Sequence, residues 1–182
     1  MTVVRQLLHP STGVDAGRIL KVNHAGEHGA VHIYAGQILA ARLRASRLTA
    51  ELAEFKAHEE KHRAIFGHEL ERRGLRRCRS FWMCGAGGYG LGILSGLMGE
   101  QAIAITTVAV ERVVLRHLHR QLAELGTSDP AATTAILQIL DDEQRHHDRS
   151  AVRLNAPGLL YRALERVVSG ATETVIWIGM RV

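Results

Sequence analysis

The chain reads Glu59-Glu60-Lys61-His62 in its first half and Glu143-Gln144-Arg145-His146 in its second half, two copies of the motif Glu-x-x-His. Each copy is preceded, 32 residues earlier, by one more glutamate, which is Glu27 in the first half and Glu111 in the second. All three positions therefore recur after a shift of 84 residues. A single Glu-x-x-His carries little information, so the prediction depends on the shared spacing.

This spacing predicts two helical hairpins whose polar side chains meet inside a four-helix bundle. In a hairpin, residues equidistant from the turn lie level with each other, which places the two turns near Leu43 and Thr127. The second position lies within Gly126–Pro130, a stretch rich in turn-forming residues. Side chains three residues apart share a helix face, so each Glu-x-x-His directs both side chains to one point. The predicted site has the ligand set of ferritin-like dinuclear metal proteins: Glu27, Glu59, His62, Glu111, Glu143 and His146.

The composition fits one all-α domain over residues 1–182. Its apolar content is 46%, and only 3 prolines interrupt long stretches of helix-forming residues. We expect residues 1–15, which precede the first predicted helix, to be loosely ordered. Two cysteines are too few for a disulfide scaffold, which indicates a reducing compartment. The first residues lack the continuous apolar core of a secretory signal, so we expect a bacterial cytoplasmic protein or one already processed.

The net charge of +5 comes from 20 arginines and 3 lysines scattered over several predicted helices. A nucleic-acid groove would need a clustered basic stripe, so we expect no nucleic-acid partner. Attraction to an anionic membrane surface fits this charge better, because a long apolar segment accompanies it.

Helices are expected over residues 16–44, 49–73 and 128–154, and a closing helix over 159–182. Between them, residues 80–99 carry no charge, and after Glu100 the chain stays uncharged to Val110, which predicts one apolar helix over 80–110. It could span a membrane, lie buried in the bundle or lie at a membrane interface. With the apolar end Val175–Ile178, the bundle would gain one or two membrane-facing helices.

His58 gives the first copy a second interpretation. His58-Glu59-Glu60-Lys61-His62 matches the zinc metalloprotease signature, in which both histidines bind zinc and the glutamate is the general base. The second copy has Asp142 in place of that first histidine, which argues against this interpretation. His58 and Asp142 are then candidates for contacting the ligands from outside. A site rich in carboxylates suits iron or manganese and therefore oxygen chemistry.

Four further motifs resemble one known family closely. They are Asn23-His24-Ala25-Gly26-Glu27, Ile33-Tyr34-Ala35-Gly36-Gln37, Thr107-Val108-Ala109-Val110-Glu111 and Asp142-Glu143-Gln144-Arg145-His146-His147-Asp148. Together they are similar to the demethoxyubiquinone hydroxylases of ubiquinone biosynthesis, and the resemblance extends from about Gly17 to the C-terminus.

The resemblance implies two iron ions on the same six residues, with Glu59 and Glu143 as bridging candidates. It implies a peripheral monooxygenase on the cytoplasmic face of the bacterial cell membrane, where other ubiquinone-biosynthesis proteins are candidate partners. The substrate would be a polyprenyl methoxy-benzoquinol and the co-substrate dioxygen. Electrons would come from the quinol itself or from NADH.

The chain departs from the family pattern in two places. The family usually has His-Tyr where this chain has His117-Leu118, and Asp is common at the position of Asn23. His117 and Tyr34 are the remaining candidates for a catalytic role beside the metal ligands. Two alternatives stay open: an iron-oxidising or storage protein of the same fold, and a non-enzymatic helical module at a membrane.

Overall fold

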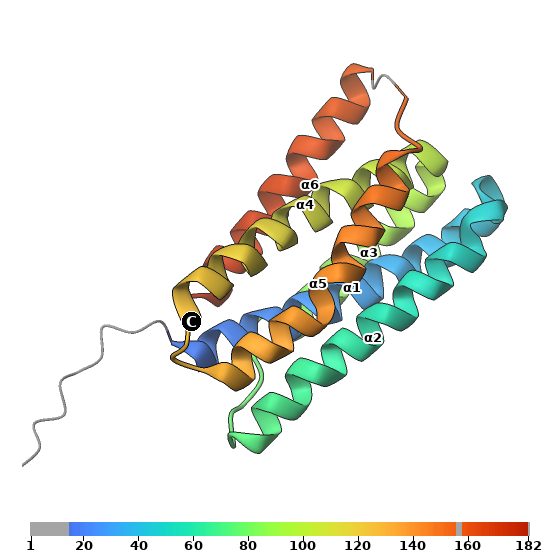
Figure 1. Cartoon of the computed structure of the whole chain (residues 1–182). Helices are drawn as coiled ribbons and strands as arrows, with labels where there is room; N and C mark the ends of the chain where they lie inside the picture. The colour runs from blue at the N-terminus through green and yellow to red at the C-terminus, as the bar shows by residue number, and fades with distance from the viewer. Residues whose placement is uncertain (1–14, 156–157, 182) are drawn as a thin grey trace, which may run out of the picture.

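The computed structural model describes residues 15–155 and 158–181, and within them the regular structure is helical (Figure 1). The described helices are α1 (Ala16–Arg44), α2 (Thr49–Arg72), α3 (Phe81–Met98), α4 (Glu100–Leu125), α5 (Pro130–Ala151) and α6 (Leu159–Gly179), with a short 3-10 turn at Ser46–Leu48. The all-α prediction is confirmed. The predicted loose order of residues 1–15 falls on residues 1–14, which lie outside the described residues, whereas Asp15 caps α1 by accepting a hydrogen bond from the Arg18 amide.

Two helical hairpins form the centre of the molecule, α1 with α2 and α4 with α5. The first turns at residues 45–48 and the second at residues 126–129, close to the positions that the spacing predicts. The second turn has Gly126 at φ 50°, and Asp129 then caps α5 by accepting from the Ala132 amide, with Pro130 in the first turn. These local signals explain why the chain reverses there.

The predicted single helix over residues 80–110 is wrong, because the chain breaks at Gly99. This glycine adopts φ 95° and ψ −172°, a conformation that other residues rarely reach. The break separates α3 from α4, so that only α4 enters the central helix group. In the part of the chain that the structure describes, no helix is both long and apolar enough to cross a membrane.

The helix α3 packs along α1, and α6 packs along α4 (Figure 1). The first pair lies so close that a Cβ atom at Gly92 would stand 2.1 Å from the Ile33 carbonyl oxygen, and one at Gly88 would stand 2.4 Å from the Gly29 oxygen. The contact of α6 is looser, because only Val168 and Gly179 of this helix are buried. These two helices leave the polar centre between α1, α2, α4 and α5.

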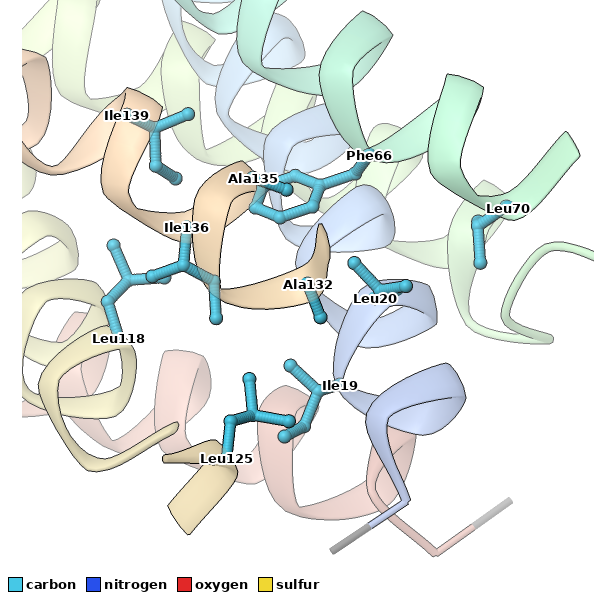
Figure 2. Close-up of a cluster of buried hydrophobic side chains, with 10 residues drawn as sticks. All are labelled: Ile19, Leu20, Phe66, Leu70, Leu118, Leu125, Ala132, Ala135, Ile136 and Ile139. Atoms are coloured by element: carbon cyan, nitrogen blue, oxygen red, sulfur yellow. The ribbon is translucent and has the colours of Figure 1, made fainter. Parts of the chain in front are cut away.

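An apolar cluster fills one end of this four-helix group. Figure 2 shows its members, contributed by all four helices: Ile19, Leu20, Phe66, Leu70, Leu118, Leu125, Ala132, Ala135, Ile136 and Ile139. A second cluster lies around Tyr34, Leu52, Phe55 and Ile103. Along α1, α2 and α4 the predicted ligands lie between these two clusters, and along α5 they follow the first cluster. Apolar side chains therefore flank the ligands at both ends of the helix group.

Candidate metal centre

The structure brings all six predicted ligands together in the interior. Each is at most 5% exposed, and each of the four central helices contributes. The ligand atoms form two groups, and within each group all atoms lie within 4.8 Å of one another. The first group is Glu27, Glu59, His62 and Glu143, and the second is Glu59, Glu111, Glu143 and His146. Because Glu59 and Glu143 belong to both groups, the geometry provides two adjacent positions for cations with two shared carboxylates.

The distances between these side chains are short. His62 Nδ1 lies 2.9 Å from Glu143 Oε1, 3.4 Å from Glu59 Oε2 and 3.8 Å from Glu27 Oε2. His146 Nδ1 lies 3.0 Å from Glu59 Oε1. The imidazole nitrogens of the two halves therefore point at the shared carboxylates.

A metal fits this arrangement because several of its atoms are buried without a hydrogen bond. Within the described residues, both Glu59 oxygens, Glu143 Oε1, His62 Nδ1 and His146 Nδ1 have no partner of acceptable geometry. Leaving such groups unpaired in the interior costs several kcal/mol, roughly 2–7 for one polar group. Cations coordinated between these atoms would remove that cost, and a donor set of carboxylates and imidazoles suits iron or manganese.

The electrostatics of the cluster also favour a cation. Burial raises the pKa of Glu27 and of Glu111 well above the usual range, and the charges of Glu143 and Glu59 raise it further. Burial opposes ionisation of Glu59 too, but the two histidines outweigh it and lower the pKa of that carboxyl. Burial favours a neutral imidazole at His62, yet Glu143 and Glu59 raise its pKa to about 12. The cluster without metal thus retains protons that a cation would displace.

Side chains outside the cluster hold the ligands in place. Tyr34 donates its hydroxyl hydrogen bond to Glu111 Oε1 at 2.9 Å. Asp142 Oδ2 lies 3.2 Å from His62 Nε2, the carboxylate–imidazole contact that fixes a metal-binding histidine. His58 Nδ1 lies 3.0 Å from His146 Nε2, with the two rings stacked. His117 is elsewhere, with Nε2 2.8 Å from Glu173 of α6.

The zinc protease interpretation finds little support in this geometry. His58 belongs to neither ligand group, whereas the three glutamates that a zinc site would leave unused, Glu27, Glu111 and Glu143, are all members. The position of His58 matches the prediction of a residue that contacts a ligand from outside.

One pair of buried, hydrogen-bonded residues was not predicted from the sequence. Asn23 and Gln121 exchange two hydrogen bonds, Nδ2 to Oε1 at 2.9 Å and Nε2 to Oδ1 at 3.0 Å, between α1 and α4. The only signal of this pair in the sequence is Asn23 itself, which stands where the family commonly has Asp. The Asn23 amide both donates a hydrogen bond to Gln121 and accepts one from it, whereas an ionised carboxylate could only accept.

The fold and the cluster define a class: helical proteins that bury a carboxylate–histidine cluster suited to a metal pair. Residues 15–179 match the family described as ubiquinone biosynthesis protein COQ7. The chain is 35% identical over 175 residues to the NADPH-dependent 3-demethoxyubiquinone 3-hydroxylase of Dictyostelium discoideum mitochondria, covering 91% of this chain and 76% of that protein. It is 30% identical over 173 residues to the 3-demethoxyubiquinol 3-hydroxylase of Rhodospirillum rubrum, covering 95% and 81%. The chain belongs to the COQ7 family, which confirms the resemblance.

Proposed function

We propose that this chain is a di-iron monooxygenase of the ferritin-like type, which hydroxylates the ring of demethoxyubiquinol, a polyprenyl methoxy-benzoquinol, in ubiquinone biosynthesis. The observation that carries the proposal is the pair of ligand groups that share Glu59 and Glu143. The names of the relatives supply the substrate class and the hydroxylation.

Two ferrous ions at this site would supply the capacity to bind and reduce dioxygen. Glu27 and His62 would hold one ion, Glu111 and His146 the other, and Glu59 and Glu143 both. In the overall reaction one oxygen atom enters the ring and the other leaves as water, which consumes two electrons and two protons. The electrons would come from the quinol or from a reduced nicotinamide nucleotide, NADH or the NADPH in the names of several relatives.

The protein itself would contribute exclusion of water and fixed orientation. The apolar clusters at both ends of the site separate it from solvent, which prevents side reactions of an oxidising centre. Burial raises the pKa of Tyr34 well above 10, so its hydroxyl stays protonated and keeps donating to Glu111. Asp142 holds the His62 ring through Nε2, leaving Nδ1 directed at the carboxylates.

The same proposal places the protein on the cytoplasmic face of the bacterial cell membrane, as a peripheral protein. Large apolar side chains are exposed on α3 and α6, among them Trp82 at 72%, Leu94 at 54%, Val167 at 68% and Trp177 at 56%. The Arg181 guanidinium lies 3.9 Å from the Trp177 ring centroid, a combination suited to the headgroup region. A polyprenyl tail would stay in the bilayer while the ring reaches the site. Other ubiquinone-biosynthesis proteins are further candidate partners of this face.

Cells that lack the gene test the reaction. We expect them to accumulate the demethoxy quinone precursor, and we expect wild-type protein, but not Glu111→Ala, to restore the mature quinone. With labelled dioxygen, one labelled atom should appear in the new ring hydroxyl. Oxidation of iron without label in the quinone would contradict the hydroxylase and support an iron-oxidising protein of the same fold.

A further inference from the structure

Thr107 lines two small cavities, one of which is also lined by Glu111. One cavity is a narrow crevice between α1 and α4, lined by Ala30, Ile33, Tyr34, Thr107, Val110 and Glu111. The other lies between α2, α4 and α5 and has a volume of about 10 Å³, close to what one water molecule needs. Thr107 therefore stands between a space beside Glu111 and a space that leads away from it.

The hydroxyl of Thr107 is buried and has no partner. The residue is 2% exposed, and Oγ1 finds no hydrogen-bond partner among the described residues. An unpartnered buried hydroxyl is costly, because it loses its bonds to water on folding. A water molecule in the adjoining cavity would satisfy it.

The second cavity has both apolar and polar walls, and the apolar part consists of Leu48, Leu52, Ile103 and Ala104. Ser150 of α5, itself 4% exposed, lines it together with Glu51 and Arg153. Glu51 and Arg153 form an ion pair whose side chains are 16% and 27% exposed. Thr107, Ser150, Glu51 and Arg153 are the lining residues that could supply the polar partners that a stable internal water needs.

The internal repeat shows that an unsatisfied hydroxyl beside a cavity occurs near Glu111 but not at the equivalent position near Glu27. A shift of 84 residues relates Thr107 to Asn23 and Gln37 to Gln121. Asn23 and Gln121 satisfy each other with two hydrogen bonds, whereas Thr107 Oγ1 and Gln37 Oε1 both lack partners. The hydrogen-bonded pair that joins α1 to α4 near Glu27 is thus replaced near Glu111 by two unsatisfied oxygen atoms, and of these two residues Thr107 lines the cavities.

Beyond Thr107 the polar groups continue to the metal centre. Thr107 precedes Glu111 by one helical turn, so both lie on the same face of α4. Tyr34 lines the same crevice and donates to Glu111 Oε1. Thr107 therefore joins the cavity lined by Ser150, Glu51 and Arg153 to the crevice lined by Tyr34 and Glu111.

We propose that the cavity holds an ordered water and that this water and the Thr107 hydroxyl form the outer part of the proton route that leads from the Glu51–Arg153 surface toward Glu111. The route rests on the proposed function: ring C–H, dioxygen, two electrons and two protons give ring C–OH and one water. The apolar clusters exclude bulk water, so these protons need a path of hydroxyl groups. The water site itself is independent of the reaction.

A pair of matched variants separates this route from a structural role. Thr107→Val removes the hydroxyl and keeps the shape. Thr106→Val makes the same change at the adjacent residue, which is 0% exposed and also has an unpartnered hydroxyl, but which lines neither cavity. Both variants should keep the metal content of wild type.

A crystal structure of the wild-type protein should show a water within hydrogen-bond distance of Thr107 Oγ1, and that of Thr107→Val should lack it. Thr107→Val should also unfold at a lower temperature than Thr106→Val, because only the former loses a bonded hydroxyl.

We expect hydroxylation by Thr107→Val to slow by at least about tenfold, with a larger solvent deuterium isotope effect on kcat, and Thr106→Val to match wild type.

A dry cavity in the wild-type crystal would overturn the proposal, as would a Thr107→Val enzyme with the wild-type rate and isotope effect. An ordered water that depends on Thr107, in a protein that hydroxylates no quinol, would leave the water site standing and contradict the proposed function instead.

Discussion

Tyr34 and Leu118 occupy equivalent positions in the two halves of the chain, since each follows the lone glutamate of its half by seven residues. Tyr34 packs against Phe55 and donates to Glu111 of the other half. Leu118 lies in the apolar cluster with Ile139, the repeat equivalent of Phe55. The Tyr34 hydroxyl therefore holds Glu111, whereas Leu118, at the equivalent position of the second half, has no hydroxyl that could hold Glu27. The two cation positions are chemically unequal.

Replacing Tyr34 by Phe tests what the phenol contributes. The variant keeps the ring that packs on Phe55 but leaves Glu111 Oε1 without its donor. We expect metal affinity or hydroxylation to fall by about 10–100-fold, the usual effect of losing a partner of a metal ligand. Metal titration followed by activity at saturating metal would measure both. An unchanged affinity together with an unchanged rate would show that the hydrogen bond is dispensable.

The shared carboxylates predict the metal stoichiometry. Anaerobic iron loading should give close to two ions per chain, because two ligand groups are present. Glu59→Ala should lose most of both ions, since Glu59 belongs to both groups. His58→Ala is the control. It should retain iron with affinity within about tenfold of wild type, because His58 contacts His146 from outside the ligand groups. Equal metal loss in the two variants would return His58 to the ligand set and revive the zinc interpretation.

The sequence predicted these residues as a set because the constant spacing in two hairpins fixes which side chains are level. The structure brings all six together, and their role as ligands stays a prediction. The Asn23–Gln121 pair could not be predicted in the same way. Its partners lie 98 residues apart, and their contact depends on how α1 and α4 are rotated about their axes. Periodicity within one helix does not determine that rotation.

At the scale of the elements, the glycines of α3 decide how closely it approaches α1. Seven glycines between residues 80 and 99 look alike in the sequence, yet the structure gives them different roles. Gly88, Gly92 and Gly96 face α1, Gly87 and Gly90 have open space around their Cβ positions, and Gly99 ends the helix at φ 95°. The sequence showed an uncharged helical stretch, but it could not show which glycine would break it, since a break requires a backbone conformation set by the packing on both sides.

Two alanine substitutions distinguish these roles. At Gly92 a methyl group would stand 2.1 Å from the Ile33 carbonyl oxygen, so α3 must move away from α1. We expect Gly92→Ala to lower the free energy of unfolding by roughly 1–3 kcal/mol, as overpacking does. At Gly90 the added methyl group would meet no described atom within 4 Å apart from its chain neighbours and the backbone of α3 itself, and Gly90→Ala should stabilise the helix by up to about 1 kcal/mol. Urea unfolding measures both, and the same sign for both would contradict this packing.

At the scale of the whole molecule, the 84-residue shift relates more than the ligands. It carries Ala16, the first residue of α1, onto Glu100, the first residue of α4. It carries His58 onto Asp142, and each of these contacts the histidine of the other half. In each half the third helix packs on the first, α3 on α1 and α6 on α4. The molecule is thus two copies of a three-helix unit, and both third helices carry exposed apolar side chains.

These exposed side chains make membrane attachment testable with the two tryptophans of the chain, Trp82 on α3 and Trp177 on α6. Both are more than half exposed, at 72% and 56%. Adding anionic vesicles should therefore shift the fluorescence of both to shorter wavelength. Neutral vesicles should bind more weakly, because each arginine near the surface adds about 1 kcal/mol of attraction to anionic lipid.

Serine substitutions then separate this face from the rest of the surface. Trp82→Ser and Trp177→Ser should each lower vesicle affinity by roughly 10–150-fold, because a buried aromatic side chain contributes about 1.5–3 kcal/mol. Leu137→Ser is the matched control, since Leu137 is 54% exposed but belongs to α5, away from these two helices. Cosedimentation with vesicles measures all three. Equal losses in the three variants would mean that no particular face binds. Wild-type protein that stays in the supernatant would remove the membrane from the proposal, and the tail of the quinol would then have to reach the site from solution or from a partner protein.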